Sequence, residues 1–269
     1  RYSGSQTSAG ALILERAWFE YAISPKLKFR IGKYLTPYGI YNEIHDAAPA
    51  YDTSVLPCSI YGWHYNLAGQ SQRFYSKFST GIVMLGRMEK NAYSFEYKMF
   101  VSNGRGPYPF EFDNNRDKGV GSRLLFALPT HGLKLGYSVY TERNGLALHA
   151  RQTFHAFDFQ CEKKRWRFTG EFAHSLLGKM DGVSRQQVAN AVYGELAYHV
   201  LQRQTVLIRY DIFDPDRVNK NDFMRDFTIA TNYQLIKQSL VKAEVHFWND
   251  MLSEQRNYIR AIASLAVVF

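Results

Sequence analysis

Charged side chains stand at every second position in several stretches of this chain. In "LKFRIGKYLTPYG", Lys28 and Arg30 alternate with Leu27, Phe29 and Ile31. A period of two places the charged and the apolar side chains on opposite faces of a β-strand. A row of charges that faces water can attract and orient ions and polar solutes without any covalent step. The chemistry open to these residues therefore depends on which face of each strand meets water.

Residues that could do covalent chemistry lack the surroundings that catalysis needs. A nucleophile requires a base and an orienting group within reach, and His149, His155 and His199 accompany no G-x-S-x-G motif. Cys58 and Cys161 are far apart in the chain and offer no zinc-ligand spacing. We therefore predict that the protein is not an enzyme and holds no metal or cofactor; a hydrolase using one of these histidines is the alternative.

The composition is typical of strands that are apolar on one face only. The 269 residues include 19 Tyr and 19 Phe, yet the mean hydropathy is -0.33. The net charge of +9 is compatible with nucleic-acid binding, but the basic residues are spread along the chain without a run of five. No apolar stretch reaches the roughly 18 residues of a membrane-spanning helix. We therefore exclude helical membrane proteins and predict no nucleic-acid partner.

Strand-like segments recur along the whole chain. Their connections alternate strictly between short, as at 24–26, and long, as at 103–118. Strict alternation is typical of an up-and-down barrel with tight turns at one end and longer loops at the other. A soluble sandwich is the alternative fold, although its links give no reason for the alternation. Thirteen strands are predicted: 11–23, 27–35, 80–87, 92–102, 119–128, 133–141, 152–162, 165–175, 191–200, 205–212, 225–233, 240–248 and 258–269.

The last predicted strand favours the barrel. In "YIRAIASLAVVF" the apolar residues from Ile259 to Phe269 share one face, and the chain ends on an aromatic residue. This ending resembles the assembly signal of bacterial outer-membrane barrels, which makes Phe269 the predicted signal residue. We predict an all-β fold: one antiparallel up-and-down transmembrane β-barrel over residues 1–269, in the bacterial outer membrane. Apolar side chains would then face lipid, and charged side chains would face a wet interior.

The number and direction of the strands predict that the barrel extends beyond this sequence. If Phe269 ends at the periplasmic side, the alternation places residues 1–10 outside, although a barrel delivered from the periplasm normally begins there. Closure in bacterial single chains also needs an even number of strands. We therefore expect that an odd number of strands, at least one, lies upstream of Arg1 or is missing from our strand assignment, and that the complete barrel has about 14–16 strands.

Several stretches, in their order along the chain, resemble phosphate-selective porins of the O/P type and related general porins. They include "LERAWFEYAISPKLKFRIGKYLTPYGI", "YSFEYKMFVSNGRG" and "FDFQCEKKRWRFTGEFA". The resemblance covers most of the chain and implies passive diffusion of small hydrophilic solutes through an outer-membrane porin. It also implies contact with outer-membrane lipid and lipopolysaccharide, delivery by the barrel-assembly machinery, and a homotrimer.

The predicted interior carries charges of both signs, whereas the family includes channels lined by ladders of Arg and Lys. Basic side chains exceed acidic ones on the inward face, so we expect a weak anion preference and no phosphate-specific site. Glu171 is interpreted as paired with Arg167 on the same face. The residues predicted to line the pore or its constriction are Arg16, Lys28, Arg30, Lys33, Lys98, Arg123, Arg167, Glu171, Arg209 and Asp211.

The segment 36–79 is too long for a plain connection between strands. We predict that it folds into the lumen as a constriction loop, where its charges would act with Lys28, Arg30 and Lys33; an external cap is the alternative. Its charged and titratable residues include His45, Asp46, Asp52, His64 and Arg73. The rival function is a structural barrel with a plugged lumen, which would anchor a partner complex or surface layer through its outer loops.

Overall fold

Thirteen strands form one antiparallel sheet in which each strand pairs with its neighbours along the chain. The computed structural model describes residues 14–44, 50–62, 65–67, 70–72, 74–104, 116–143, 151–178, 186–251 and 253–267. The strands are β1 (Ala17–Ser24), β2 (Leu27–Leu35), β5 (Phe78–Lys90), β6 (Tyr93–Ser102), β7 (Gly119–Leu128), β8 (Leu133–Arg143), β9 (Arg151–Lys163), β10 (Trp166–Leu177), β11 (Gln187–Leu201), β12 (Gln204–Asp214), β13 (Met224–Ile236), β14 (Ser239–Asp250) and β15 (Asn257–Val267). All thirteen predicted strands are confirmed, while the ends of the first and last, including Phe269, lie outside the described residues.

The two faces of this sheet have the reverse of the polarity of a soluble protein. Phe19 is 65% exposed and Ile259 is 69% exposed, whereas Arg209 and Lys242 are each 1% exposed. Apolar side chains thus cover the convex face and charged side chains are enclosed on the concave face. A sandwich with an apolar core would bury the first set and expose the second, so the soluble alternative is wrong.

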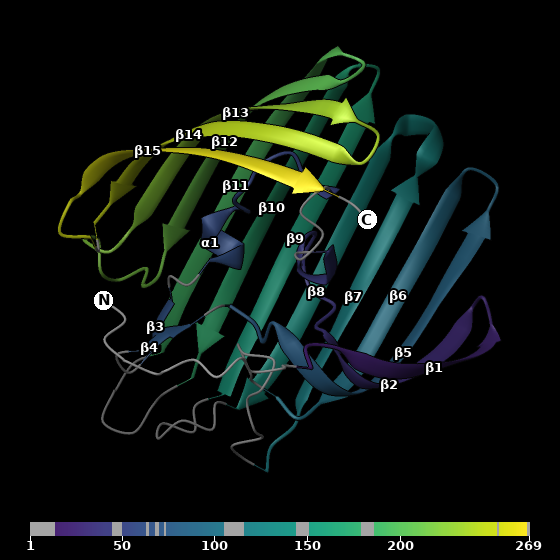
Figure 1. Cartoon of the computed structure of the whole chain (residues 1–269). Helices are drawn as coiled ribbons and strands as arrows, with labels where there is room; N and C mark the ends of the chain where they lie inside the picture. The colour runs from purple at the N-terminus through teal and green to yellow at the C-terminus, as the bar shows by residue number, and fades with distance from the viewer. Residues whose placement is uncertain are drawn as a thin grey trace.

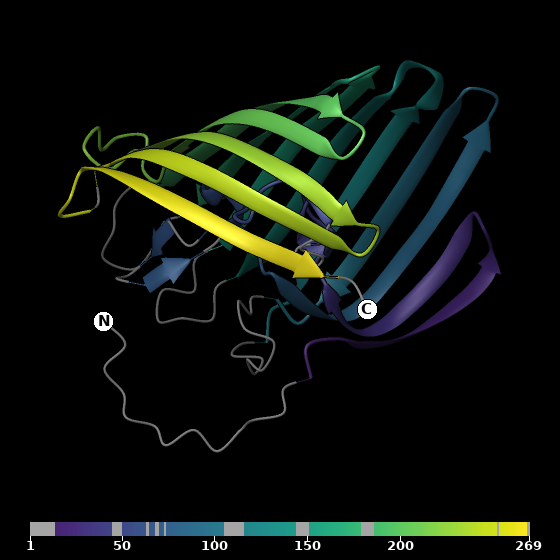
Figure 2. The same ribbon diagram turned by 45° about the horizontal axis from the view of Figure 1, so that its top comes forward.

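The sheet rolls into an open trough, with β1 and β2 at one edge and β15 at the other (Figures 1 and 2). Among the strands that the structure describes, β1 and β15 pair only with β2 and β14, respectively, so the trough has an open seam. The all-β, up-and-down architecture is confirmed, and the seam is consistent with an incomplete barrel.

The short connections have backbone conformations that tight hairpins require. Asn91 and Lys164 have φ values of 53° and 58° in the two-residue turns after β5 and β9, and Gly132 has φ 65° in the turn after β7. Positive φ in such turns matches the right-handed twist of the paired strands. These turns lie at one end of the sheet, and the long connections lie at the other.

The longest described connection, between β2 and β5, lies on the concave side of the trough (Figure 1). It contains α1 (Cys58–Tyr61) and a separate hairpin of β3 (Tyr65–Leu67) and β4 (Gln70–Gln72), none of which the sequence pattern predicted. Among the described residues, no helix is long and apolar enough to cross a bilayer. We call residues 36–44, 50–62 and 74–77 the inner segment.

Candidate pore interior

The two ends of the inner segment are tied together where it leaves the sheet. The Thr36 amide donates to the Lys77 carbonyl at 3.0 Å, and the Thr36 hydroxyl lies 2.6 Å from that of Ser79. The Asn42 side-chain amide donates to the carbonyl oxygens of Thr36 and Lys77 at 2.8 and 3.1 Å. These hydrogen bonds fix the point from which the inner segment turns toward the concave face.

Tyrosines pack the inner segment against strand β11. Tyr38 stacks on Tyr75 with ring centroids 4.1 Å apart, and Tyr41 meets Tyr61 edge-on at 5.6 Å. Tyr193 of β11 stacks on Tyr41 at 6.4 Å, and all five rings are buried. Because aromatic rings hold few rotamers and interlock, this cluster gives the inner segment one defined position.

Glu171 of β10 accepts hydrogen bonds from the inner segment where that segment bends sharply. The Tyr61 hydroxyl donates to Glu171 Oε2 at 2.6 Å and accepts from the Tyr41 amide at 3.0 Å, and the Ile40 amide points to the same carboxylate oxygen at 3.5 Å. Burial and the nearby Glu171 carboxylate raise the pKa of Tyr61 well above its usual range, so the hydroxyl remains a donor. Gly39 has φ 60°, and a Cβ there would lie 2.3 Å from the Tyr61 hydroxyl oxygen. The close approach therefore requires glycine.

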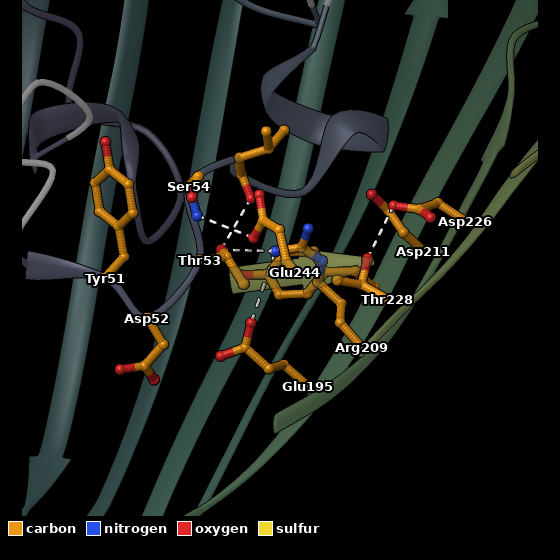
Figure 3. Close-up of polar contacts among 12 residues, drawn as sticks. Tyr51, Asp52, Thr53, Ser54, Glu195, Arg209, Asp211, Asp226, Thr228 and Glu244 are labelled. Atoms are coloured by element: carbon orange, nitrogen blue, oxygen red, sulfur yellow. Dashed lines mark hydrogen bonds and ion pairs between the residues drawn. The ribbon is translucent and has the colours of Figure 1, made fainter. Parts of the chain in front are cut away.

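Buried charges of β14 hold the backbone of the inner segment (Figure 3). Lys242 Nζ donates to the carbonyl oxygens of Tyr51 and Thr53 at 2.6 and 2.9 Å. Glu244 Oε2 accepts from the Ser54 amide at 2.9 Å. Buried backbone groups need such partners, and here charged side chains of the wall supply them.

Strand β12 adds a second pair of buried charges to this attachment. Arg209 donates to the Thr53 hydroxyl at 3.1 Å and lies 3.8 Å from Glu195, while Asp211 accepts from the Ser59 amide at 3.2 Å. We call Arg209, Asp211, Lys242 and Glu244 the clamp. Its members contact the inner segment instead of open water: Asp211, Lys242 and Glu244 bond its backbone, and Arg209 bonds the Thr53 hydroxyl.

A cavity of about 410 Å³ lies between the inner segment and strands β6–β10. This is within the size range of small-molecule sites, roughly 300–1,000 Å³. Its walls combine polar, apolar and charged side chains. The charged lining residues are Lys98, Arg123, Lys134 and Arg167 on the basic side and Glu43, Asp52, Glu96 and Asp158 on the acidic side.

Most charges around this cavity are paired. Lys98 Nζ lies 2.6 Å from a carboxylate oxygen of Glu43 on the inner segment. Arg123 donates to Asp158 at 2.7 and 3.2 Å across the wall. Lys134 is exposed and forms no ion pair with any residue that the structure describes. The four basic and four acidic lining residues balance, and Lys134 is a lining cation that no described ion pair neutralises.

A further ion pair joins the inner segment to β10. Arg167 contacts the carboxylate of Asp52, which also accepts from Asn232 of β13 at 3.0 Å. The interpretation that Glu171 pairs with Arg167 is therefore wrong. Two residues four apart on one strand are separated by about 13 Å, so each finds its partner on the inner segment.

The predicted pore residues fall into separate groups. Lys98, Arg123 and Arg167 line the cavity, whereas Glu171, Arg209 and Asp211 are buried against the inner segment. The remaining four predicted residues lie at or before the edge formed by β1 and β2. Lys28 and Arg30 pair with Glu20 at 3.6 and 2.8 Å, and Arg16 is exposed before β1. Lys33 shares the face of Phe29 and Ile31, so its prediction as a pore residue is wrong. The structure therefore brings three of the ten predicted residues to one cavity.

Two polar residues of this interior carried no signal in the sequence. Glu43 lies on the inner segment, which has no strand period, and the partner of Asn232, Asp52, is positioned by the path of that segment. His45, Asp46, His64 and Arg73, predicted in the same region, lie outside the described residues.

Comparison with known proteins supports the architecture without assigning a family. No protein-family profile matches the sequence, and no curated protein matches it. An anion-selective porin from Comamonas acidovorans is similar in structure, with a TM-score of 0.57 and 12% identity over 90% of this chain and 70% of that one. OmpT, an outer membrane protein of Vibrio cholerae, has a TM-score of 0.55 and 10% identity over 91% of this chain and 84% of that one. The chain thus has the fold of outer-membrane β-barrel porins.

Proposed function

We propose that this protein is an outer-membrane porin that allows passive diffusion of small hydrophilic solutes. The observation that carries the proposal is a cavity of about 410 Å³, lined by charges of both signs, on the concave face of a sheet whose convex face is apolar. An apolar exterior suits lipid, and a polar interior suits water and solutes. The protein would lie in the bacterial outer membrane among lipid and lipopolysaccharide, be inserted by the barrel-assembly machinery, and act as a homotrimer without any cofactor.

A weak anion preference is the expected selectivity. The ion pairs beside the cavity leave Lys134 as an exposed cation, and an unpaired cation on the cavity wall favours anions without excluding cations. The sequence resemblance to phosphate-selective porins supports anion passage, while the mixed signs of charge argue against a phosphate-specific site. Further strands between β15 and β1 would complete a barrel of about 14–16 strands.

Catalysis is not part of this proposal. Among the described residues, His246 has the surroundings most similar to a catalytic relay: its Nδ1 lies 2.7 Å from Asp226 and 3.0 Å from the Thr228 hydroxyl. Its Nε2 faces Glu244 at 3.4 Å. Both ring nitrogens are thus directed at carboxylates, which leaves neither available to activate a nucleophile.

The test is the single-channel conductance and reversal potential of the purified protein, including its complete barrel, in a planar bilayer under a salt gradient. An open channel with a modest shift of the reversal potential toward the anion side supports the proposal. A folded barrel that conducts no ions contradicts it.

A plugged structural barrel is the second candidate function. The observation in its favour is the tyrosine cluster, which fills the interior near the long connections: Tyr38 is 0% exposed and Tyr75 is 1% exposed. Such a barrel would present its outer loops to a partner. Deleting residues 40–74 separates the candidates, because a constricted porin should conduct more after the deletion, whereas a plugged barrel should change from silent to conducting.

A further inference from the structure

Asp52 lies between two cavities. One is the cavity of about 410 Å³ beside β6–β10, and the other, of about 290 Å³, lies beside the short turns that join β11 to β12 and β13 to β14. Asp52 lines both. The second cavity is rich in donors, among them Arg203, Asn232 and Lys237. Asp52 therefore lies where the two cavities come closest in their lining residues.

The groups that hold this carboxylate belong to two different strands of the wall, β10 and β13. Arg167 of β10 contacts it from one side, and Asn232 of β13 donates to Oδ1 at 3.0 Å from the other. A guanidinium presents planar, paired donors that fit the oxygens of a carboxylate or phosphate, and an amide adds another donor. The wall therefore provides the donor set for a small oxyanion, and the position is occupied by a side chain of the protein itself.

Different groups hold the backbone and the side chain of Asp52. Lys242 holds the carbonyl oxygens of both flanking residues, Tyr51 and Thr53, so the backbone is fixed. The side chains of Arg167 and Asp52 remain 26% and 16% exposed. Rotamer changes of solvent-accessible side chains are fast, on the order of nanoseconds, so the carboxylate can swing away from Arg167 while the inner segment stays in place.

The neighbouring ion pair Arg123–Asp158 differs from the Arg167–Asp52 pair because both of its partners belong to the sheet and are less exposed. Both of its side chains project from adjacent parts of the rigid sheet, and their exposures are only 11% and 2%. A solute anion would have to displace a buried partner that cannot leave. The Arg167 pair instead has its acidic partner on a connecting segment, and that partner, Asp52, lines two cavities.

We propose that Arg167 and Asn232 form a binding site for small oxyanions, in which Asp52 is a built-in competitor that each passing anion displaces. This inference rests on the proposed porin function and adds the site at which anions are selected. The ligand is a carboxylate or phosphate group small enough to fit between the two cavities. Displacement exchanges one weak ion pair for another, which favours passage over tight retention.

The test measures anion binding by titration calorimetry of the full-length protein in detergent, with sodium acetate, inorganic phosphate and chloride as probes. Removing the competitor in Asp52→Asn should tighten acetate or phosphate binding about fivefold, the factor expected for loss of an exposed ion pair. Glu96→Gln is the matched control, because it removes the same charge from the same cavity at a residue paired with Arg87. It should change binding less than twofold.

The outcomes separate the site from a general field effect. The gain in Asp52→Asn should disappear in the double variant with Arg167→Gln; a gain that survives there, or one equalled by Glu96→Gln or seen equally with chloride, would overturn the proposal. A larger gain for acetate assigns carboxylates, and a larger gain for phosphate assigns phosphates. Asp52→Ala serves as a second variant if Asp52→Asn does not fold.

Conductance of the same variants keeps this inference distinct from the proposed function. A silent barrel whose Asp52→Asn variant gains acetate or phosphate affinity supports the site and contradicts the porin. A conducting barrel in which Asp52→Asn changes neither affinity nor reversal potential contradicts the site alone.

Discussion

The wall formed by β6–β10 and the wall formed by β12–β14 use the same alternation of charged and apolar residues for different purposes. On β6–β10, charges such as Lys98 and Lys134 face a cavity of about 410 Å³. On β12–β14, Arg209 and Lys242 are 1% exposed; Arg209 donates to the Thr53 hydroxyl and Lys242 to backbone carbonyl oxygens of the inner segment. Inward charge in a barrel of this kind therefore does not by itself identify a pore residue. What covers the charge decides whether it meets solutes or supports structure.

The largest difference between the walls should appear when one lysine is removed from each. Lys242→Met leaves two carbonyl oxygens and Glu244 without their cation, and we expect a loss of about 3 kcal/mol in the free energy of unfolding. Lys134→Met, the matched control on β8, should change it by less than about 0.5 kcal/mol. Denaturant unfolding of the folded protein in detergent measures both. Equal losses in the free energy of unfolding for the two variants would show that the lysines of the two walls do not differ in structural role.

The tyrosine attachment at Glu171 should have an intermediate effect. Tyr61→Phe removes the hydroxyl that donates to Glu171 at 2.6 Å and accepts from the Tyr41 amide. We expect a loss of about 1–3 kcal/mol because both partners stay buried. Tyr97→Phe removes an exposed hydroxyl bonded to the Lys26 carbonyl and should cost about 0.5 kcal/mol or less. Equal losses in the free energy of unfolding for Tyr61→Phe and Tyr97→Phe would contradict the role of the Tyr61 hydroxyl in holding the inner segment.

A pH dependence should arise in the long connection beside the clamp strands. Burial, with Asp214 and Asp216 nearby, raises the pKa of Asp222 from 3.8 to about 6. The folded protein therefore binds this proton more tightly than the unfolded chain, and the free energy of unfolding should fall as the pH rises from about 4 to about 6. Asp222→Asn should flatten this part of the profile, and the exposed Glu254→Gln should leave it unchanged. An unaltered slope in Asp222→Asn would contradict the assignment.

The smallest effect on stability should accompany a change in selectivity. Lys134→Glu reverses the exposed charge of the cavity, so we expect the reversal potential to move toward the cation side while the free energy of unfolding changes by less than about 0.5 kcal/mol. Lys28→Glu, at a residue 3.6 Å from Glu20 near the sheet edge, should shift the potential less. A larger shift from Lys28→Glu would place the selective region near β1 and β2 instead.

Strand positions could be predicted from the sequence because a period of two is a local property. Residues 27–35 and 119–128 were predicted with the bounds that β2 and β7 have. The contacts of the inner segment could not be predicted, because Lys242 and Asp52 find their partners through the path of a connection that has no period. The Glu171–Arg167 interpretation failed for the same reason: strand parity identifies the shared face but not the partner that covers it.

The central claim is that the inner segment lies against the strands that carry the clamp. Its most direct test is a disulfide between Ser54→Cys and Ser264→Cys in a Cys58→Ser/Cys161→Ser background. The hydroxyl oxygens of Ser54 and Ser264 are 2.7 Å apart, a separation that side-chain sulfurs can bridge. Mild oxidation of the folded protein should cross-link this pair and leave the conductance unchanged, while Ser54→Cys with Ser122→Cys, on the convex face of β7, should stay unlinked. Failure of the first pair to cross-link in the folded barrel would contradict the account.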